Sequence, residues 1–296
     1  MSINTMSYSN LDENKHNNMI QSSNTRLENL ISKSLEIRKD VVEISIANGG
    51  HAAASLSCVE IMVTLYYEVM NISPNNINDD SRDRYIHSKG HAENVLYSVL
   101  SDRGFFPREW INKYYRKGDC RLGGHPDKDI PGVEVTTGSI GHGLGMAVGM
   151  ALSAKMDCKK HFHFVLMGDA ECTEGSVWEA ALSASYHKLS NIIAIIDNNA
   201  IGASDFLANY SSLDKLEDKW KSFGWNAVSC DGHNIKDLES IFKSMIKSKS
   251  SKPNIVIANT IKGKGVSFLE NHPLGHVMGI DTESKISQAR KDVDGL

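Results

Sequence analysis

The chain has 296 residues, of which 41% are hydrophobic and 23% are charged, and its formal net charge is −4. This composition is ordinary for a globular protein and provides no basic surface for nucleic acid. The five cysteines form no C-x-x-C pair, which argues against a disulfide framework or a zinc site. The sequence shows neither a membrane-length apolar run nor a signal peptide, so we expect a cytoplasmic protein without membrane contact.

The N-terminal part of the chain differs in composition from the rest. Residues 1–24 are rich in Asn, Ser and Asp, which predicts a disordered or loosely attached arm. Residues 25–296 are expected to form one domain. It begins with a long helix from Thr25 to the Asn-Gly-Gly sequence that ends at Gly50. A second helix is expected from Ser57, where Ser57 and Glu60 fit a capping box.

Beyond these helices, short apolar runs alternate with helical patterns. Strands are expected at 84–88, 162–167, 192–196, 225–230 and 254–259. Helices are expected at 92–100, 141–152, 213–223 and 236–248, and another begins at a capping box formed by Ser176 and Glu179. An irregular loop is expected over 110–131. The alternation predicts an α/β fold, doubly wound, with a mainly parallel sheet and helices on both faces.

Polar residues follow two neighbouring strands of this predicted sheet. Asp169 follows the strand that ends at Gly168, and Asn199 lies 30 residues after Asp169. The carboxyl ends of parallel strands meet at one edge, where such sheets bind ligands. A carboxylate, an amide oxygen and the carbonyl of Ile201 suit Mg²⁺ or Ca²⁺ that also binds phosphate oxygens. Taken alone, Gly-Asp or Asn-Asn is more typical of a tight turn than of a metal ligand.

The motif GDA-ECTEG, followed by DNNAI, resembles the thiamine diphosphate signature G-D-G…N-N. It is most similar to the N-terminal half of a transketolase. The resemblance implies that Gly168, Asp169, Ala170, Asn199 and Ile201 bind the cofactor, and that Asp169, Asn199 and Ile201 bind the metal. Ala170 stands where the family usually has a third Gly, and we expect the diphosphate still to approach its backbone N–H.

Four histidines stand beside glycine or proline at the ends of predicted elements. Each of them alone is more typical of a surface or structural histidine. The resemblance implies that His91 hydrogen-bonds the diphosphate, and that three others line the channel and orient substrate oxygens: His51, His125 and His276. Imidazole suits this work because it donates or accepts hydrogen bonds near neutral pH. At His276 the family's flanking aromatic residue is replaced by Gly275.

The stretch 133–141, VEVTTGSIG, resembles the family's VETTTG-x-L-G loop. By this resemblance the cofactor rings contact Gly138, Ser139 and Ile140. His142 replaces the Gln that commonly follows. The G-x-G-x-G run from Gly141 could instead suggest a dinucleotide loop, but Met146 prevents completion of G-x-G-x-x-G.

Three charged residues near these motifs have two interpretations each. Glu174 is either a solvated acid at a helix N-terminus, where the dipole favours it, or, by the resemblance, a catalytic-site residue at the subunit interface. Lys262 and Lys264 are compatible with anion binding and equally with a solvated loop.

The resemblance covers roughly residues 25–280, and only the diphosphate-binding domain. A complete transketolase continues with a pyrimidine-binding domain, whose glutamate activates the cofactor, so the chain is either half of a split enzyme or a fragment. We expect the N-terminal subunit of a two-chain enzyme that uses thiamine diphosphate and Mg²⁺, for which Ca²⁺ can substitute. It would transfer a two-carbon ketol unit from a ketose or ketose phosphate to an aldehyde. The expected partner is a separately encoded C-terminal transketolase subunit, in a heterodimer or heterotetramer.

Two alternatives remain open from the sequence. A related thiamine diphosphate carboligase or decarboxylating enzyme could share this whole half. The chain could also be a non-catalytic, cofactor-binding regulatory subunit. The sequence does not specify the donor or the acceptor.

Overall fold

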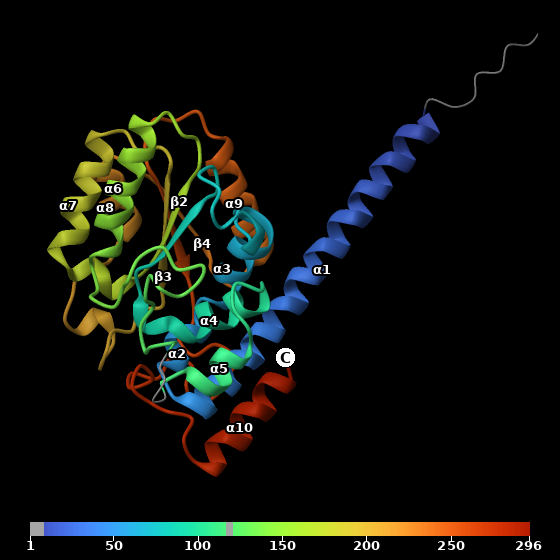
Figure 1. Ribbon diagram of the computed structural model, residues 1–296, viewed down its shortest axis with the longest axis vertical. Coiled ribbons are helices and arrows are strands. Elements are labelled where there is room, and N and C mark those ends of the chain that lie inside the picture. The colour runs from blue at the N-terminus through green and yellow to red at the C-terminus, as the bar shows by residue number, and fades with distance from the viewer. Residues whose placement is uncertain (1–8, 117–120) are drawn as a thin grey trace, which may run out of the picture.

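The computed structural model describes residues 9–116 and 121–296 (Figure 1). The chain begins with a 40-residue helix, α1 (Ser9–Asn48), whose N-terminal part extends away from the rest of the molecule in Figure 1. The expected helix start at Thr25 is therefore wrong, and the arm expected over residues 1–24 is helical from Ser9. Residues 1–8 lie outside the described residues, and the division into arm and domain stays a prediction.

A five-stranded, fully parallel sheet forms the centre of the molecule, as expected. Its order is β1-β2-β3-β5-β4. The strands are β1 (Arg84–His87), β2 (His163–Gly168), β3 (Ile192–Asn198), β4 (Asn226–Asp231) and β5 (Asn254–Asn259). The adjacent inner strands β2 and β3 each contain a run of buried apolar residues because both faces of the sheet are covered. In their register, Gly168 lies beside Asp197, which brings the polar strand ends to one edge.

Two layers of helices cover the sheet, which confirms the doubly wound α/β fold (Figure 1). On one face pack α6 (Gly143–Met156), α7 (Gly175–Tyr186) and α8 (Leu216–Ser222). On the other pack α1, α2 (Ala52–Leu56), α3 (Val59–Thr64), α4 (Glu93–Asp102) and α9 (Ile235–Lys247). Alternate strand residues enter the two cores: Phe164 of β2 packs on the α1 side, and Val165 packs on the α6 side.

Both expected capping boxes are wrong, because the N-cap residues are Cys58 for α3 and Glu174 for α7, so neither serine is at the cap position. Ser57 lies between α2 and α3 and donates to Asp197, 2.6 Å away, while Glu60 pairs with Arg38. The hydroxyl of Ser176 donates to the carbonyl of Gly141 at 2.9 Å. The helix α3 continues as a π-helical turn over Leu65–Val69.

Besides α2, which lies where a break between helices was expected, two helices of the described residues were not expected from the sequence. The first, α5 (Glu109–Tyr114), lies inside the region that we expected to be irregular; the part of that region at 117–120 lies outside the described residues. The second, α10 (Glu283–Asp294), packs along α1 but is mostly polar and buries only Ala289 and Val293. Short 3₁₀ turns occupy Pro74–Asn76, Gly90–Ala92, Asp169–Thr173 and Leu207–Asn209. Within the described ranges, no helix has the length and apolar character needed to cross a membrane.

The first residue of β2, His163, makes the free energy of unfolding depend on pH. His163 is 1% exposed, and its Nδ1 has no partner among the described residues. Burial lowers its pKa from 6.5 to about 4, and nearby His161 adds to this effect. The unfolded state therefore binds more protons than the folded state between pH 6.5 and about pH 4. The contribution of His163 to the free energy of unfolding is fully present above pH 6.5 and is lost as the pH falls toward 4.

We expect His163→Leu to remove part of this acid sensitivity. The loss of unfolding free energy between about pH 7.5 and pH 5 should shrink by about 2 kcal/mol, because the neutral side chain takes up no proton on unfolding. Urea unfolding at both pH values measures this difference. The control is His142→Gln, which changes an exposed histidine and should leave the pH dependence unaltered. If His163→Leu and the parent chain lose the same unfolding free energy between these pH values, His163 does not cause the acid sensitivity.

Candidate active site

A cavity of about 270 Å³ opens at the carboxyl ends of the strands. Most of the residues predicted from the sequence line it, namely His51, His91, His125, Gly138, Ile140, Gly168, Asp169, Ala170, Asn199, Ile201 and His276. Ser139 and Glu174 do not line it. A larger depression of about 610 Å³ lies beside it, over the loop after β3, but it contains none of the histidines and no buried charge. We therefore place the site in the smaller cavity.

Three of the histidines form a cluster on one wall. The rings of His51 and His276 stack with centroids 4.3 Å apart, and the ring of His91 lies 4.9 Å from that of His276. His51 Nδ1 donates to the carbonyl of His276 at 2.7 Å, because a carbonyl oxygen can only accept. Burial lowers the pKa of His91 well below its usual value, and burial together with Lys262 lowers that of His276 to about 3. Both rings are thus neutral near pH 7.

The fourth histidine, His125, is fixed from two sides at the mouth of the cavity. The hydroxyl of Tyr97 lies 3.0 Å from the carbonyl of Gly123 and 3.1 Å from that of His125. Gly138 has a φ of 144°, and a Cβ at this position would lie 2.8 Å from the His125 ring. Glycine is therefore required at 138, both for its backbone conformation and for the close approach of the ring.

The three predicted metal ligands lie around the same cavity. The carboxylate of Asp169 is 2% exposed and accepts hydrogen bonds from the N–H groups of Ala170 and Ala200. Asn199 Oδ1 accepts from the N–H of Ile201 at 3.2 Å. Burial, with the negative charge of Asp197, raises the pKa of Asp169 to about 6. The N–H of Ala170, expected to face a diphosphate, is occupied by Asp169.

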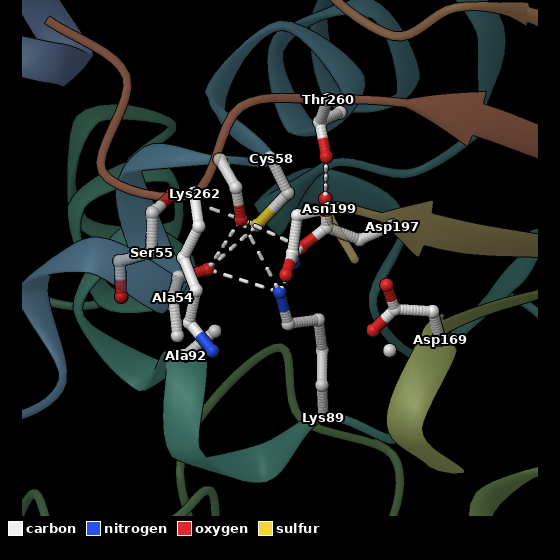
Figure 2. Close-up of polar contacts among 12 residues, drawn as sticks. Ala54, Ser55, Cys58, Lys89, Ala92, Asp169, Asp197, Asn199, Thr260 and Lys262 are labelled. Carbon is white, nitrogen blue, oxygen red and sulfur yellow. Dashed lines mark hydrogen bonds and ion pairs between the residues drawn. The ribbon is translucent and has the colours of Figure 1, made fainter. Parts of the chain in front are cut away.

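Lys262, from the segment after β5, is buried at this edge with 3% exposure (Figure 2). Its ammonium donates to the carbonyls of Ile201 and Gly202 at 2.8 and 2.9 Å. No carboxylate in the described part of the chain forms an ion pair with it, and burial beside Lys89 lowers its pKa to about 8. A solvated loop is therefore wrong for Lys262. Lys264 lies outside the cavity and is 3.8 Å from Glu270.

Two further buried charges, Lys89 and Asp197, were not predicted from the sequence. They form an ion pair at the cavity, which Lys89 lines, with exposures of 1% and 0%. Burial opposes the charge of each, but their mutual attraction prevails: it raises the pKa of Lys89 and lowers that of Asp197. Their place in the chain is the one feature of the sequence that indicates the site: Lys89 directly precedes Gly90-His91, and Asp197 follows five apolar residues of β3.

Glu171 is a second acid that sequence reasoning missed. It is 1% exposed and accepts from the N–H groups of Gly168 and Gly141, both at 2.9 Å, and from the hydroxyl of Ser88 at 2.6 Å. It thus joins the ends of β1 and β2 to the loop before α6. Glu174 instead packs against Gly141: a Cβ added to Gly141 would lie 2.6 Å from the Cβ of Glu174.

A comparison with known protein families decides what this site belongs to. The family model for the thiamine diphosphate binding domain of transketolase matches residues 30–293. The chain belongs to the transketolase family. The histidine cluster, the buried lysine and the oxygen donors therefore lie in a thiamine diphosphate-binding domain of that family.

Relatives of two lengths match this transketolase domain. One subunit of the apulose-4-phosphate transketolase of Phocaeicola vulgatus is 39% identical over 90% of this chain and 95% of its own length. The 6-deoxy-6-sulfo-D-fructose transketolase subunit SqwG of Clostridium sp. is also 39% identical, over 81% of this chain and 87% of its own. Human transketolase is 35% identical over 85% of this chain, which spans 40% of its length.

A solved transketolase shares the fold. The structure of the Campylobacter jejuni enzyme superposes with a TM-score of 0.78 at 27% identity, over 90% of this chain and 42% of that one. The chain therefore spans about two fifths of the single-chain transketolases that it resembles.

The buried ammonium of Lys262 yields a prediction for cofactor binding. We expect Lys262→Met to weaken thiamine diphosphate binding by about 10- to 100-fold, the effect of losing one buried, charge-assisted hydrogen bond. Isothermal titration calorimetry in the presence of Mg²⁺ measures the change. The matched control is Lys264→Met, which removes a lysine two positions away outside the cavity and should have little effect. Equal affinities for the two variants would show that Lys262 does not bind the cofactor.

Proposed function

We propose that this chain is the N-terminal, diphosphate-binding subunit of a two-chain transketolase. The enzyme transfers a two-carbon ketol unit from a ketose or ketose phosphate to an aldehyde, and it requires thiamine diphosphate and Mg²⁺. The observation that carries the proposal is Lys262, a buried cation with no carboxylate partner among the described residues, facing Asp169 and the histidine cluster across one cavity. A buried charge of this kind requires a counterion, and a diphosphate provides one.

The lining of the cavity fits the cofactor. Lys262 and His91 would bind the diphosphate, since one is cationic and the other offers a ring nitrogen for a hydrogen bond. Gly168 leaves open space where a Cβ would lie, so a ligand can approach the backbone there. Gly138 and Ile140 would contact the cofactor rings, with the exposed Ser139 between them.

The oxygen donors fit a hard divalent cation. The carboxylate of Asp169, the amide oxygen of Asn199 and the carbonyl of Ile201 would be the protein ligands of Mg²⁺, with Ca²⁺ as a substitute. The Ile201 carbonyl already accepts from Lys262, but its oxygen has a second lone pair. Asp169 is well placed to bind a cation because its described partners are backbone N–H groups.

When bound, thiamine diphosphate supplies a carbon nucleophile that accepts the ketol unit from the ketose and releases it to the aldehyde. The histidines of this chain would manage the substrate's oxygens. His51, His125 and His276 would hydrogen-bond hydroxyl and carbonyl groups of the sugar and exchange protons with them. The lowered pKa values of His125 and His276 favour neutral rings, which suit both tasks because each carries one donor and one acceptor nitrogen.

A partner chain would complete the enzyme. The relatives that match this chain over most of their length are named as individual transketolase subunits, and the single-chain enzymes are far longer. Exposed Ile140 and the open face of α6 at Gly145 and Gly149 provide a surface on which a second chain could pack closely. Glu174 lies against Gly141 beside this surface. The partner would be a C-terminal transketolase subunit, in a heterodimer or heterotetramer.

Two observations bear on the cellular compartment and on whether the subunit takes part in catalysis. The four described cysteines are free thiols, which supports a reducing compartment such as the cytoplasm. Four histidines lining the cavity favour catalysis, because a subunit that only held the cofactor would need its phosphate and metal contacts alone.

One prediction of the proposed function concerns the metal. Asp169→Asn should reduce the Mg²⁺ affinity of the thiamine diphosphate complex by more than about 100-fold, since loss of an outer-shell partner alone costs about 10- to 100-fold. Calorimetry gives the affinity, and circular dichroism checks the fold, because the amide oxygen of Asn can still accept a backbone hydrogen bond. Asp231→Asn, at the exposed end of β4, is the control. Unchanged Mg²⁺ affinity in Asp169→Asn would rule out this ligand.

Another prediction of the proposed function concerns the partner chain. The purified chain should show little or no ketol transfer, and activity should appear when a C-terminal transketolase subunit encoded nearby is added. The reason is that a pyrimidine-binding domain must provide the acid that activates the cofactor. A coupled assay with ketose and ketose phosphate donors measures the rate, and Asp169→Asn mixed with the same partner is the inactive control. Full turnover by the chain alone would refute the two-chain proposal.

A further inference from the structure

Four hydrogen-bond donors converge on the fully buried carboxylate of Asp197 at the end of β3 (Figure 2). The ammonium of Lys89, the hydroxyl of Ser57 and the amide of Asn199 reach Oδ2, and the hydroxyl of Thr260 reaches Oδ1. These groups follow β1, join α2 to α3, follow β3 and follow β5, respectively. One side chain therefore ties together four segments at the edge of the sheet that carries the cavity.

Asp197 determines which way the amide of Asn199 points. The Asn199 Nδ2 donates to Asp197 Oδ2 at 3.0 Å, and its Oδ1 accepts from the N–H of Ile201 at 3.2 Å. An ionised carboxylate can only accept and a backbone N–H can only donate, so both neighbours require the same orientation. The Oδ1 has a further lone pair, so it can accept the N–H and still contact a cation.

Asp197 also determines where the charge of Lys89 lies. The ammonium has three acceptors: Asp197, the carbonyl of Ala54 at 3.0 Å and the hydroxyl of Ser57 at 3.5 Å. Asp169, on the other side of Figure 2, is bound by no lysine in the described ranges, and backbone N–H groups hold its oxygens. The ion pair thus keeps a buried lysine from competing with a cation for Asp169.

We propose that Asp197 is a positioning residue for the divalent cation: it holds the amide oxygen of Asn199 available to the cation and it keeps Lys89 away from Asp169. Asp197 itself is not a ligand. The inference rests on the proposed function, because it requires the cation that Asp169 and Asn199 would bind. A purely structural role for Asp197 would instead affect folding without acting through Asn199.

A double-mutant cycle separates these two roles. The parent chain, Asp197→Asn, Asn199→Ala and the double variant are titrated with Mg²⁺ at saturating thiamine diphosphate, by calorimetry. We expect Asp197→Asn to weaken Mg²⁺ binding by about 10- to 100-fold, as for other groups that orient a metal ligand. In the Asn199→Ala background it should add less than about threefold, because residues that act through one another are not additive. Asp231→Asn, at the end of the edge strand β4, should leave the affinity unchanged.

Urea unfolding without cation or cofactor shows whether each variant is folded. If Asp197→Asn leaves the charge of Lys89 unpaired and the chain does not fold, Lys89→Met/Asp197→Asn removes both charges and enters the same cycle. Unchanged Mg²⁺ affinity, or an equal loss with and without Asn199, overturns the inference alone. A parent chain that binds no Mg²⁺ with thiamine diphosphate overturns the proposed metal site, and this inference with it.

Discussion

The burial of charge at one edge of the sheet is the constraint on which the rest of the site depends. Transfer of an ion from water into a protein costs several kcal/mol even after relaxation. Lys89 and Asp197 offset this cost as an ion pair, and Asp197 gains three further hydrogen bonds. Lys262 has only two carbonyls, and Asp169 only two backbone N–H groups, among the described residues. Apart from Glu171, which two backbone N–H groups and Ser88 hold, the edge thus has one neutralised pair and two separated charges. The proposed metal-bound diphosphate would complete this arrangement.

Much of the fold could be predicted because buried parallel strands leave a clear pattern. The apolar runs of β2 and β3 lie within a residue or two of their expected ranges, and the polar residues after them necessarily meet at one edge. The position of Asp169 and Asn199 at the cavity could be predicted for the same reason, with the family resemblance as support. The cavity around them also contains His51 and His276, which only that resemblance had brought together.

The residues that were missed have their partners far away in the chain. Lys89 and Asp197 are 108 positions apart, and nothing local distinguishes Lys89 from a surface lysine or Asp197 from the first residue of a turn. The capping boxes failed for a related reason: the fold begins α3 after Cys58 and α7 after Glu174, and the hydroxyls of Ser57 and Ser176 donate to distant acceptors instead. Local patterns state which hydrogen bonds a side chain can make, whereas the fold determines which of them it does make.

The contact between α10 and α1 shows how one side of the core is closed. Ala289 and Val293 of α10 close the same core that α1 and the sheet form, and Arg290 binds Glu43 across the two helices. This part of the apolar interior is sealed by segments of the chain itself, whereas the cavity lies at the ligand-binding edge of the sheet. Closure of this part of the core therefore does not depend on whether the cavity at the carboxyl ends of the strands holds a ligand.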